Sequence, residues 1–533
     1  MKMMTRSGIS LQRSYAAAGG NGESPGEFPF TRGRLASPHT QTAWIQRELA
    51  GEGDGCRTNQ QIRYLLAHGQ NGIDVIGDAP TQSLLDPDHA LAREAVGTQG
   101  VSLCRKQDFL DLFKDVPFEH VSISSSAPAF LALSGLVLAA REAGFPLDRL
   151  RGSVLHGPLY TEDCSYAWHL PVEFRVRLAL DSIEYCSQHM PKFHAYLEDT
   201  YFFSESGLSP AEEMALGFVQ LRHLVRKLMA RGVAVDSFAP RIAFLVNCGM
   251  DFFEEIAKIR ATRRLYAKMM RDEFGATNPR SLSAAITSHT SGLSLTAQQP
   301  VNNVVRGAVQ ALALVLAGVQ AVEVSAFDEA YRTPSQDAHI VALRTQQILE
   351  LEAGVAKVLD PLGGSYFIES LTDQLETRIR ARIDEIEAMG DLEALSASGF
   401  FGDIFHQAME DAQLGLEKGE VPVVGVNVHA MAEKDDTLLR DIATAKIETW
   451  RGHTKKIEQF KRGRDIERLS ERLDAVAVTV AGSENLIPAV IEALDASATM
   501  GEIATTMRRA LGMPADIFDH PLPGRDTGAK NVA

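Results

Sequence analysis

The sequence predicts an α/β fold, in which a parallel (β/α)8 TIM barrel is followed by a mainly helical C-terminal extension. Short apolar runs alternate with amphipathic, helix-like segments over roughly 300 residues, which is the pattern of repeated βα units. No GxGxxG turn supports the runner-up fold, an open doubly wound sheet that binds a dinucleotide. After DPLGGSYFIESL (360–371) the sequence becomes charged, rich in Glu and helical in pattern, which predicts a different architecture beyond the barrel.

The expected elements follow from these patterns in chain order. Apolar runs predict strands at residues 73–76, 121–124, 242–246, 283–287 and 321–325. Amphipathic segments between them predict helices that include residues 127–144, 171–189 and 210–231. The clearest βα unit is DSFAPRIAFLVNCG (236–249), because its apolar strand leads into a long amphipathic helix with a basic end.

Four regions are expected along the chain. Residues 1–25 are rich in Gly and Ser without an apolar signal core, so we expect a flexible arm, with a transit peptide as the alternative. The barrel is expected over 26–371 and the helical extension over 372–512, with a break at 422–428. Residues 513–533 contain three prolines and are expected to form a tail.

Composition limits the function classes. A net charge of −16 argues against nucleic acid as the main partner, because phosphate binding requires an electropositive face. Apolar runs such as 311–324 are too short for a membrane span. The five cysteines include no CxxC pair, which indicates reduced thiols in a cytoplasmic protein and neither a disulfide framework nor a zinc site.

Nine motifs occur in order along most of the chain. They are FPFTRG (28–33), GDAPTQ (77–82), HMPKF (189–193), FAPR (238–241), HTSGLSLTAQQPVNNVVR (289–306), FDEA (327–330), DPLGGSY (360–366), VVGVN (423–427) and TMGEI (499–503). Together they resemble the coenzyme B12-dependent acyl-CoA mutases, the methylmalonyl-CoA mutase family, over roughly residues 28–512.

The resemblance implies radical chemistry inside the barrel. In that family adenosylcobalamin supplies a radical that abstracts hydrogen from an acyl-CoA, whose carbon skeleton then rearranges. The CoA chain passes along the barrel axis and cobalamin covers the C-terminal face. Small and hydroxylated side chains are therefore expected in the bore, where other barrels pack bulky ones.

The resemblance also assigns residues to ligands. It places Arg47, Lys192 and Arg241 on the CoA phosphates or adjoining chain, although surface ion pairs are the alternative for each. Ser153 is assigned to the same substrate-binding set. Four residues are assigned to the cofactor, with Tyr201 beside them: Glu205, Gln320, Ser325 and Glu329. Helix capping is the alternative for the carboxylates, above all for Glu329.

Several positions depart from the family pattern around the reacting end of the substrate. Ser165 and Leu35 stand where methylmalonyl-type members have an arginine and a tyrosine that hold the substrate carboxylate. Leu49 replaces a second tyrosine, Leu155 a glutamine near the thioester, and Phe202 a histidine that hydrogen-bonds the thioester carbonyl.

These changes predict an apolar pocket and disfavour methylmalonyl-CoA as the substrate. We expect a neutral, branched or longer acyl group instead. His289 replaces a further glutamine and can hydrogen-bond or transfer a proton near neutral pH, with a purely structural histidine as the alternative. The expected catalytic positions are therefore Tyr201, Phe202 and His289.

The cobalt-ligating DxHxxG motif of the family's B12 module is absent from this sequence. The resemblance therefore implies a large subunit that needs a separate small cobalamin-binding subunit carrying DxHxxG, in a homodimer or a heterotetramer. Two alternatives remain open. One is a mutase acting on an acyl thioester bound to a carrier protein, and the other is a non-catalytic paralogue that scaffolds or regulates a mutase.

Overall fold

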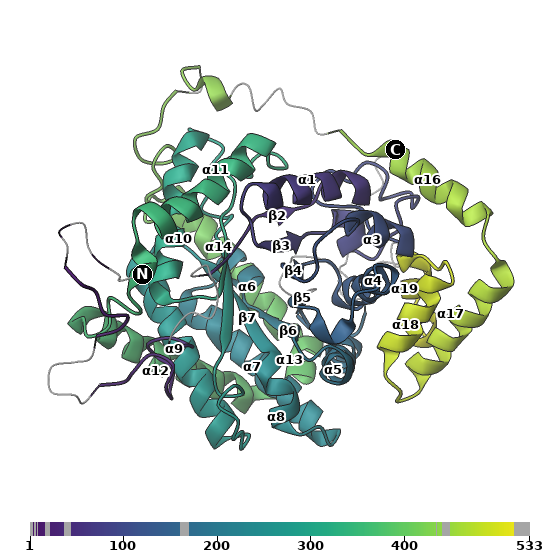
Figure 1. The fold of residues 1–533 in the computed structure, drawn as a ribbon, viewed down its shortest axis with the longest axis horizontal. Coiled ribbons are helices and arrows are strands. Elements are labelled where there is room, and N and C mark those ends of the chain that lie inside the picture. Colours follow the sequence, from purple (N-terminus) through teal and green to yellow (C-terminus); the bar gives the residue numbers. More distant parts are fainter. Residues whose placement is uncertain are drawn as a thin grey trace, which may run out of the picture.

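The computed structural model contains a barrel of parallel strands surrounded by helices, with a separate group of C-terminal helices on one side (Figure 1). The structure describes residues 4, 7, 9–15, 22–36, 44–159, 170–432, 434–439 and 448–515.

The barrel wall is a single sheet of nine parallel strands. They follow the order β1-β9-β8-β7-β6-β5-β4-β3-β2. The strands are β1 (Ile45–Arg47), β2 (Leu49–Ala50), β3 (Gly72–Val75), β4 (Ser122–Ser125), β5 (Gly152–His156), β6 (Phe193–Asp199), β7 (Ile242–Cys248), β8 (Ala285–Thr290) and β9 (Ala321–Glu323).

The two strands at the ends of this order close the barrel. Only Glu48 separates β1 from β2 in the chain. Arg47 of β1 lies opposite Glu323 of β9, and Leu49 of β2 lies opposite Asp74 of β3. Residues 45–50 therefore occupy one place in the wall, which gives eight strand positions and confirms the predicted (β/α)8 barrel.

The sequence patterns located five of the strands and missed three strand positions. The missed segments are 45–50, 152–156 and 193–199. The first and last carry Gln46, Arg47, Glu48, His194, Glu198 and Asp199. A search for apolar runs overlooks such strands because polar residues interrupt them. Some of these line the bore, as Arg47 and His194 do, and others bond to the outer helices, as Glu48 and Glu198 do.

Helices cover the outside of the barrel and continue beyond it. Those interleaved with the strands are α1 (Gly55–Ala67), α2 (Ala79–Gln82), α3 (Lys106–Leu112), α4 (Ala129–Glu142), α5 (Val172–His189), α6 (Tyr201–Glu205), α7 (Pro210–Ala230), α8 (Val235–Phe238), α9 (Phe252–Asp272), α10 (Asn303–Ala317) and α11 (Gln336–Gln347). The later helices are α12 (Tyr366–Met389), α13 (Leu392–Ala397), α14 (Phe400–Glu417), α16 (Arg451–Arg462), α17 (Ile466–Ala481), α18 (Leu486–Asp495) and α19 (Met500–Ala510).

The C-terminal helices complete the burial of the barrel's outer layer. Helix α4 is apolar almost all round, and α18 packs against the face that the barrel leaves uncovered. Helix α12 packs against α7 and α9 in the same way. The predicted domain boundary at residue 371 falls inside this helix, because α12 begins at Tyr366. The predicted break at 422–428 is non-helical.

One segment, Pro300–Ala317, is long and apolar enough by composition to span a membrane. This segment begins upstream of residue 311, where the apolar run 311–324 described above starts. Half of it is buried, and its helix α10 packs against α9, β7 and β8. Its apolar character therefore matches its place in the barrel layer.

Candidate active site

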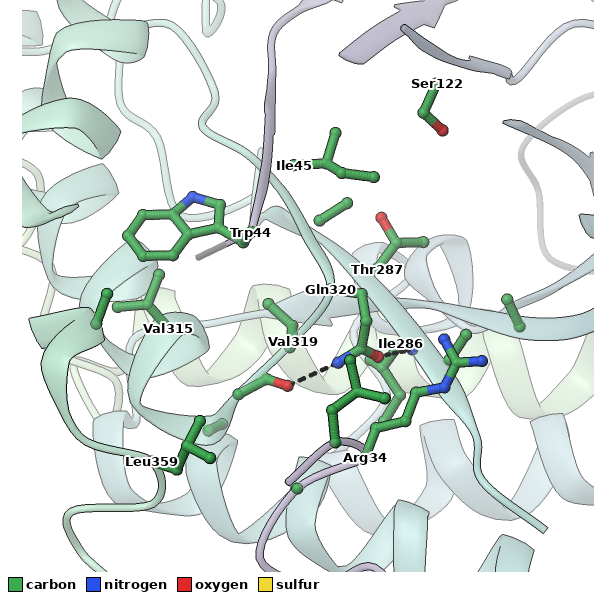
Figure 2. Close-up of a pocket in the computed structure, with 18 of the residues that line it drawn as sticks. Arg34, Trp44, Ile45, Ser122, Ile286, Thr287, Val315, Val319, Gln320 and Leu359 are labelled. Atoms are coloured by element: carbon green, nitrogen blue, oxygen red, sulfur yellow. Dashed lines mark hydrogen bonds between the residues drawn. The ribbon is translucent and has the colours of Figure 1, made fainter. Parts of the chain in front are cut away.

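Small hydroxylated side chains line the inside of the barrel. Successive residues of a strand point to opposite faces, so every second side chain enters the bore. Ser122, Ser153 and Thr287 line a cavity of about 540 Å³ at the amino ends of the strands (Figure 2). Above Ser122, the Oγ atoms of Ser124 and Ser153 lie 2.9 Å apart. This is the polar bore that the sequence predicts.

Basic side chains surround the mouth of this cavity. Lys192 and Arg241, both predicted from the sequence, lie in its wall together with Arg34 and Arg151. Burial first, and then the nearby Arg241 and Arg280, lower the pKa of Arg34; burial and Arg280 lower that of Arg241. Among the described residues, no carboxylate forms an ion pair with Arg34 or Arg241. Guanidinium groups gathered in this way have the charge and the donors that suit a phosphorylated ligand.

Sequence reasoning missed Arg34, although it directly follows the FPFTRG motif. Figure 2 shows it reaching from the N-terminal segment past Ile286 and Gln320. Leu35, its neighbour, also lines this cavity.

Arg47 lies deeper in the bore than the other predicted cations. Its Nε atom is 3.2 Å from Asp74 Oδ2, and its Nη2 group donates to Thr287 Oγ1. Both members of the ion pair are almost fully buried. Arg47 borders the deep end of the cavity, so its place suits the acyl end of a ligand better than a phosphate.

The structure places Gln320 apart from the other residues predicted to bind the cofactor. It precedes β9, at the amino end of the barrel, and lines the cavity there. Its Oε1 atom accepts from the Ile286 backbone N–H at 2.8 Å, and its Nε2 donates to Gly318 O at 2.9 Å (Figure 2). Strand β9 lies between Gln320 and the FDEA motif, so Gln320 and Glu329 stand at opposite ends of the barrel. The prediction that Gln320 lies beside Glu329 is therefore wrong.

Carboxylates gather at the opposite end of the barrel. Glu205 ends α6 and accepts hydrogen bonds from Asn247 Nδ2 at 2.6 Å, Ser291 Oγ at 2.7 Å and Leu293 N at 2.8 Å. Burial nevertheless raises the pKa of Glu205. Glu329 accepts from Ala326 N at 3.1 Å within a turn that begins no helix, and burial raises its pKa to about 7.

His289 lies between the two ends. Its Nε2 atom is 3.1 Å from Asp74 Oδ2, and its Nδ1 is 3.6 Å from Glu323 Oε2. The ring of Tyr201 packs edge-on against the imidazole, with centroids 5.3 Å apart. Burial lowers the pKa of His289 more than Asp74 raises it, so the imidazole is neutral at pH 7.

The remaining predicted residues lie in different parts of the barrel. Leu155 is buried near the end of β5, Phe202 is in α6 and Leu49 is in β2. Leu35 lies at the mouth of the cavity. Ser325 donates two hydrogen bonds to Thr290, from its backbone N–H to Thr290 Oγ1 at 2.7 Å and from its Oγ to Thr290 O at 3.0 Å. Ser165 lies outside the described residues.

Sequence reasoning missed three buried acidic residues of the barrel wall, which are Glu48, Asp74 and Glu323. Asp74 and Glu323 face His289 inside the bore, whereas Glu48 accepts from Gln346 of the outer helix α11. Burial raises the pKa of Glu48, with repulsion by Glu323 added, and burial raises the pKa of Glu323, with repulsion by Glu329 and Asp74 added. A charged residue inside a short buried strand, as in GIDV (72–75), is the signal that could have identified Asp74.

A second cluster lies outside the barrel, where Cys104, Asp108 and His453 place ligand atoms within 4.8 Å of one another. Asp108 Oδ2 accepts from the Cys104 and Arg105 backbone N–H groups, which caps α3. No local sequence pattern indicates this cluster, because His453 belongs to the distant helix α16.

Comparisons with known proteins agree with this geometry. The family model described as methylmalonyl-CoA mutase matches residues 4–513. The chain is 35% identical to a 2-hydroxyisobutanoyl-CoA mutase large subunit of Aquincola tertiaricarbonis, over 92% of this chain and 87% of that protein. It is also 35% identical to a methylmalonyl-CoA mutase of Rhizobium meliloti (strain 1021), over 92% of this chain and 68% of that protein. A methylmalonyl-CoA mutase of Escherichia coli (strain K12) is 31% identical, over 95% and 71% of the two chains.

Proposed function

The chain belongs to the methylmalonyl-CoA mutase family of B12-dependent isomerases, and we propose that it is the large, substrate-binding subunit of such a mutase. The proposed reaction is a radical 1,2-shift in the carbon skeleton of a non-carboxylated acyl-CoA.

The arrangement of charge along the barrel carries this proposal. At the amino end, the guanidinium groups of Arg34 and Arg241, which no described carboxylate pairs, suit the phosphates of CoA. Carboxylates occupy the other end, and the neutral His289 lies between the two ends, where the acyl group would react. A pantetheine chain lying in the polar bore would join the two.

The residues at the carboxyl end fit an adenosyl group. Glu205 and Glu329 are acceptors for ribose hydroxyls, and Asn247 Oδ1 is a buried acceptor that lacks a donor among the described residues. Bound adenosylcobalamin supplies a carbon-centred radical for hydrogen abstraction. The buried walls of the bore keep water away from that radical.

The substrate is proposed to lack a free carboxylate. Arg47 is the guanidinium nearest the reacting end, and Asp74 already pairs with it. The ionised, buried Asp74 carboxylate would repel a second carboxylate. A branched or longer neutral acyl group meets neither obstacle, and one similar protein is named for a 2-hydroxyacyl substrate.

CoA is preferred over a carrier protein as the holder of the acyl group. The basic mouth has more cations than the single phosphate of a phosphopantetheine arm requires. We further propose a cytoplasmic complex with a small cobalamin-binding subunit that carries DxHxxG, because one similar protein is named as the large subunit of a mutase.

Reconstitution tests the proposal. The purified chain should show no adenosylcobalamin-dependent turnover of acyl-CoA esters, and a DxHxxG subunit should restore it. Turnover by this chain alone would reject the two-subunit assignment. Binding of acyl-CoA without turnover in any pairing would favour the non-catalytic paralogue.

A further inference from the structure

A chain of contacts crosses the bore between the CoA cavity and the carboxyl end. Asp74 is on β3 and His289 is on β8, and the sheet order places β9 and the β1/β2 strand between them. Their 3.1 Å contact therefore spans the inside of the barrel. Arg47 joins the same carboxylate at 3.2 Å.

The depth of Asp74 follows from the strand geometry. Gly72 of β3 pairs with Ser122, which lines the cavity wall. Asp74 is the next inward residue on β3, which places it about 7 Å further toward the carboxyl end. Tyr201 contacts His289 from that end. Asp74 thus lies where the cavity ends and the reacting end of an acyl chain would begin.

The two oxygens of Asp74 differ. Oδ2 faces both Arg47 and His289, whereas Oδ1 is buried and no side chain among the described residues donates to it. Burial opposes ionisation, but Arg47 and then His289 hold the pKa of Asp74 below its ordinary value. The carboxylate is therefore ionised at neutral pH, and an ionised oxygen left without a donor is costly.

We propose that Asp74 determines substrate specificity by accepting, at Oδ1, a hydrogen bond from a hydroxyl group on the acyl chain. The preferred substrates are then hydroxyacyl-CoA esters. This inference rests on the proposed acyl-CoA mutase function and narrows its substrate class. A purely aliphatic acyl group would exclude water from Asp74 without replacing the missing donor, and a carboxylated one would add a like charge.

A pantetheine amide N–H is the other group that could supply this donor. It is present in every CoA ester, so the two sources separate by comparing esters that differ only in the hydroxyl. Two matched pairs suffice: 2-hydroxyisobutanoyl-CoA with isobutanoyl-CoA, and 3-hydroxybutanoyl-CoA with butanoyl-CoA.

The experiment is calorimetric titration of the full-length chain with both pairs and with free CoA. In the unmodified protein, one hydroxylated ester should bind at least about tenfold more tightly than its partner, as expected for a hydrogen bond to a buried carboxylate. Asp74→Leu should bring that ratio near one while free CoA binds as before. Asp74→Asn, which keeps an acceptor oxygen, should retain part of the preference.

Each other outcome has one meaning. If the unmodified protein binds the two esters of each pair with equal affinity, the inference is overturned. This result does not depend on whether any variant folds. An equal loss for all esters in Asp74→Leu also overturns it, because it assigns the donor to pantetheine. If neither CoA nor any ester binds the unmodified protein, the proposed function itself fails.

Discussion

Lys258 Nζ lies 2.8 Å from Glu213 Oε2, and neither side chain is exposed to solvent. The same ammonium group contacts Glu255 Oε2 at 2.7 Å and donates to Asn247 O at 2.8 Å. Burial lowers the pKa of Lys258, but Glu213 and Glu255 raise it above its ordinary value, so the lysine stays charged. One buried cation thus fixes α7, α9 and the end of β7 beneath Glu205.

Lys258→Met should lower the free energy of unfolding by about 3–5 kcal/mol, because it leaves two buried carboxylates without a cation. Chemical denaturation measures this change. Lys227→Met is the matched control, since Lys227 pairs with Glu393 at the surface and its loss should cost less than about 1 kcal/mol. Similar losses in the two variants would contradict the buried-cluster account.

Arg34→Ala and Arg241→Ala should each weaken CoA binding by roughly tenfold to a hundredfold, because each removes a charged donor from the phosphate site. Calorimetry with CoA and with 3′-dephospho-CoA measures the loss and shows which side chain holds that phosphate. Arg226→Ala, which disrupts a surface pair with Glu387, is the control and should bind normally. Unchanged affinity in both cavity variants would remove CoA from this end of the barrel.

Ionisation of Glu329 should make stability fall as pH rises. Its pKa is raised to about 7 in the folded protein from an ordinary 4.5, so its contribution is full below pH 4.5 and is lost as pH rises through 7. The loss amounts to no more than about 3 kcal/mol. The pKa of Glu213 is also raised to about 7, so Glu329→Gln should remove only part of the pH dependence of the melting temperature. An identical pH profile in the variant would disprove the assignment.

Asp86→Ala should loosen the C-terminal helices before the barrel. Asp86 accepts from Thr499 Oγ1 at 2.5 Å and from Gly501 N at 2.8 Å, and it pairs with Lys461 at 2.9 Å. Limited proteolysis should therefore cleave after α16 while the barrel stays intact. Asp88→Ala is the control because Asp88 contacts Lys461 and not α19. Simultaneous loss of both parts would show that they form one cooperative unit.

The sequence predicted the barrel because its apolar strands and helices alternate, and it placed Lys192, Arg241 and Ser153 in the cavity wall. It misplaced Gln320 because the spacing between Gln320 and Glu329 does not reveal that a strand carries them to opposite ends. It missed Asp74 because a contact between β3 and β8 depends on closure of the sheet, which no local pattern records. The pocket that Leu49, Leu155 and Phe202 predict to be apolar therefore also contains a charged network.

The strand at residues 45–50 closes the barrel through main-chain pairing, with β1 against β9 and β2 against β3. Main-chain pairing does not depend on which side chains point inward. Leu49 can therefore change with little loss of barrel closure, whereas replacing Arg47 would leave the buried Asp74 carboxylate without its guanidinium partner. A new side chain at position 49 can thus reshape the bore without opening the wall.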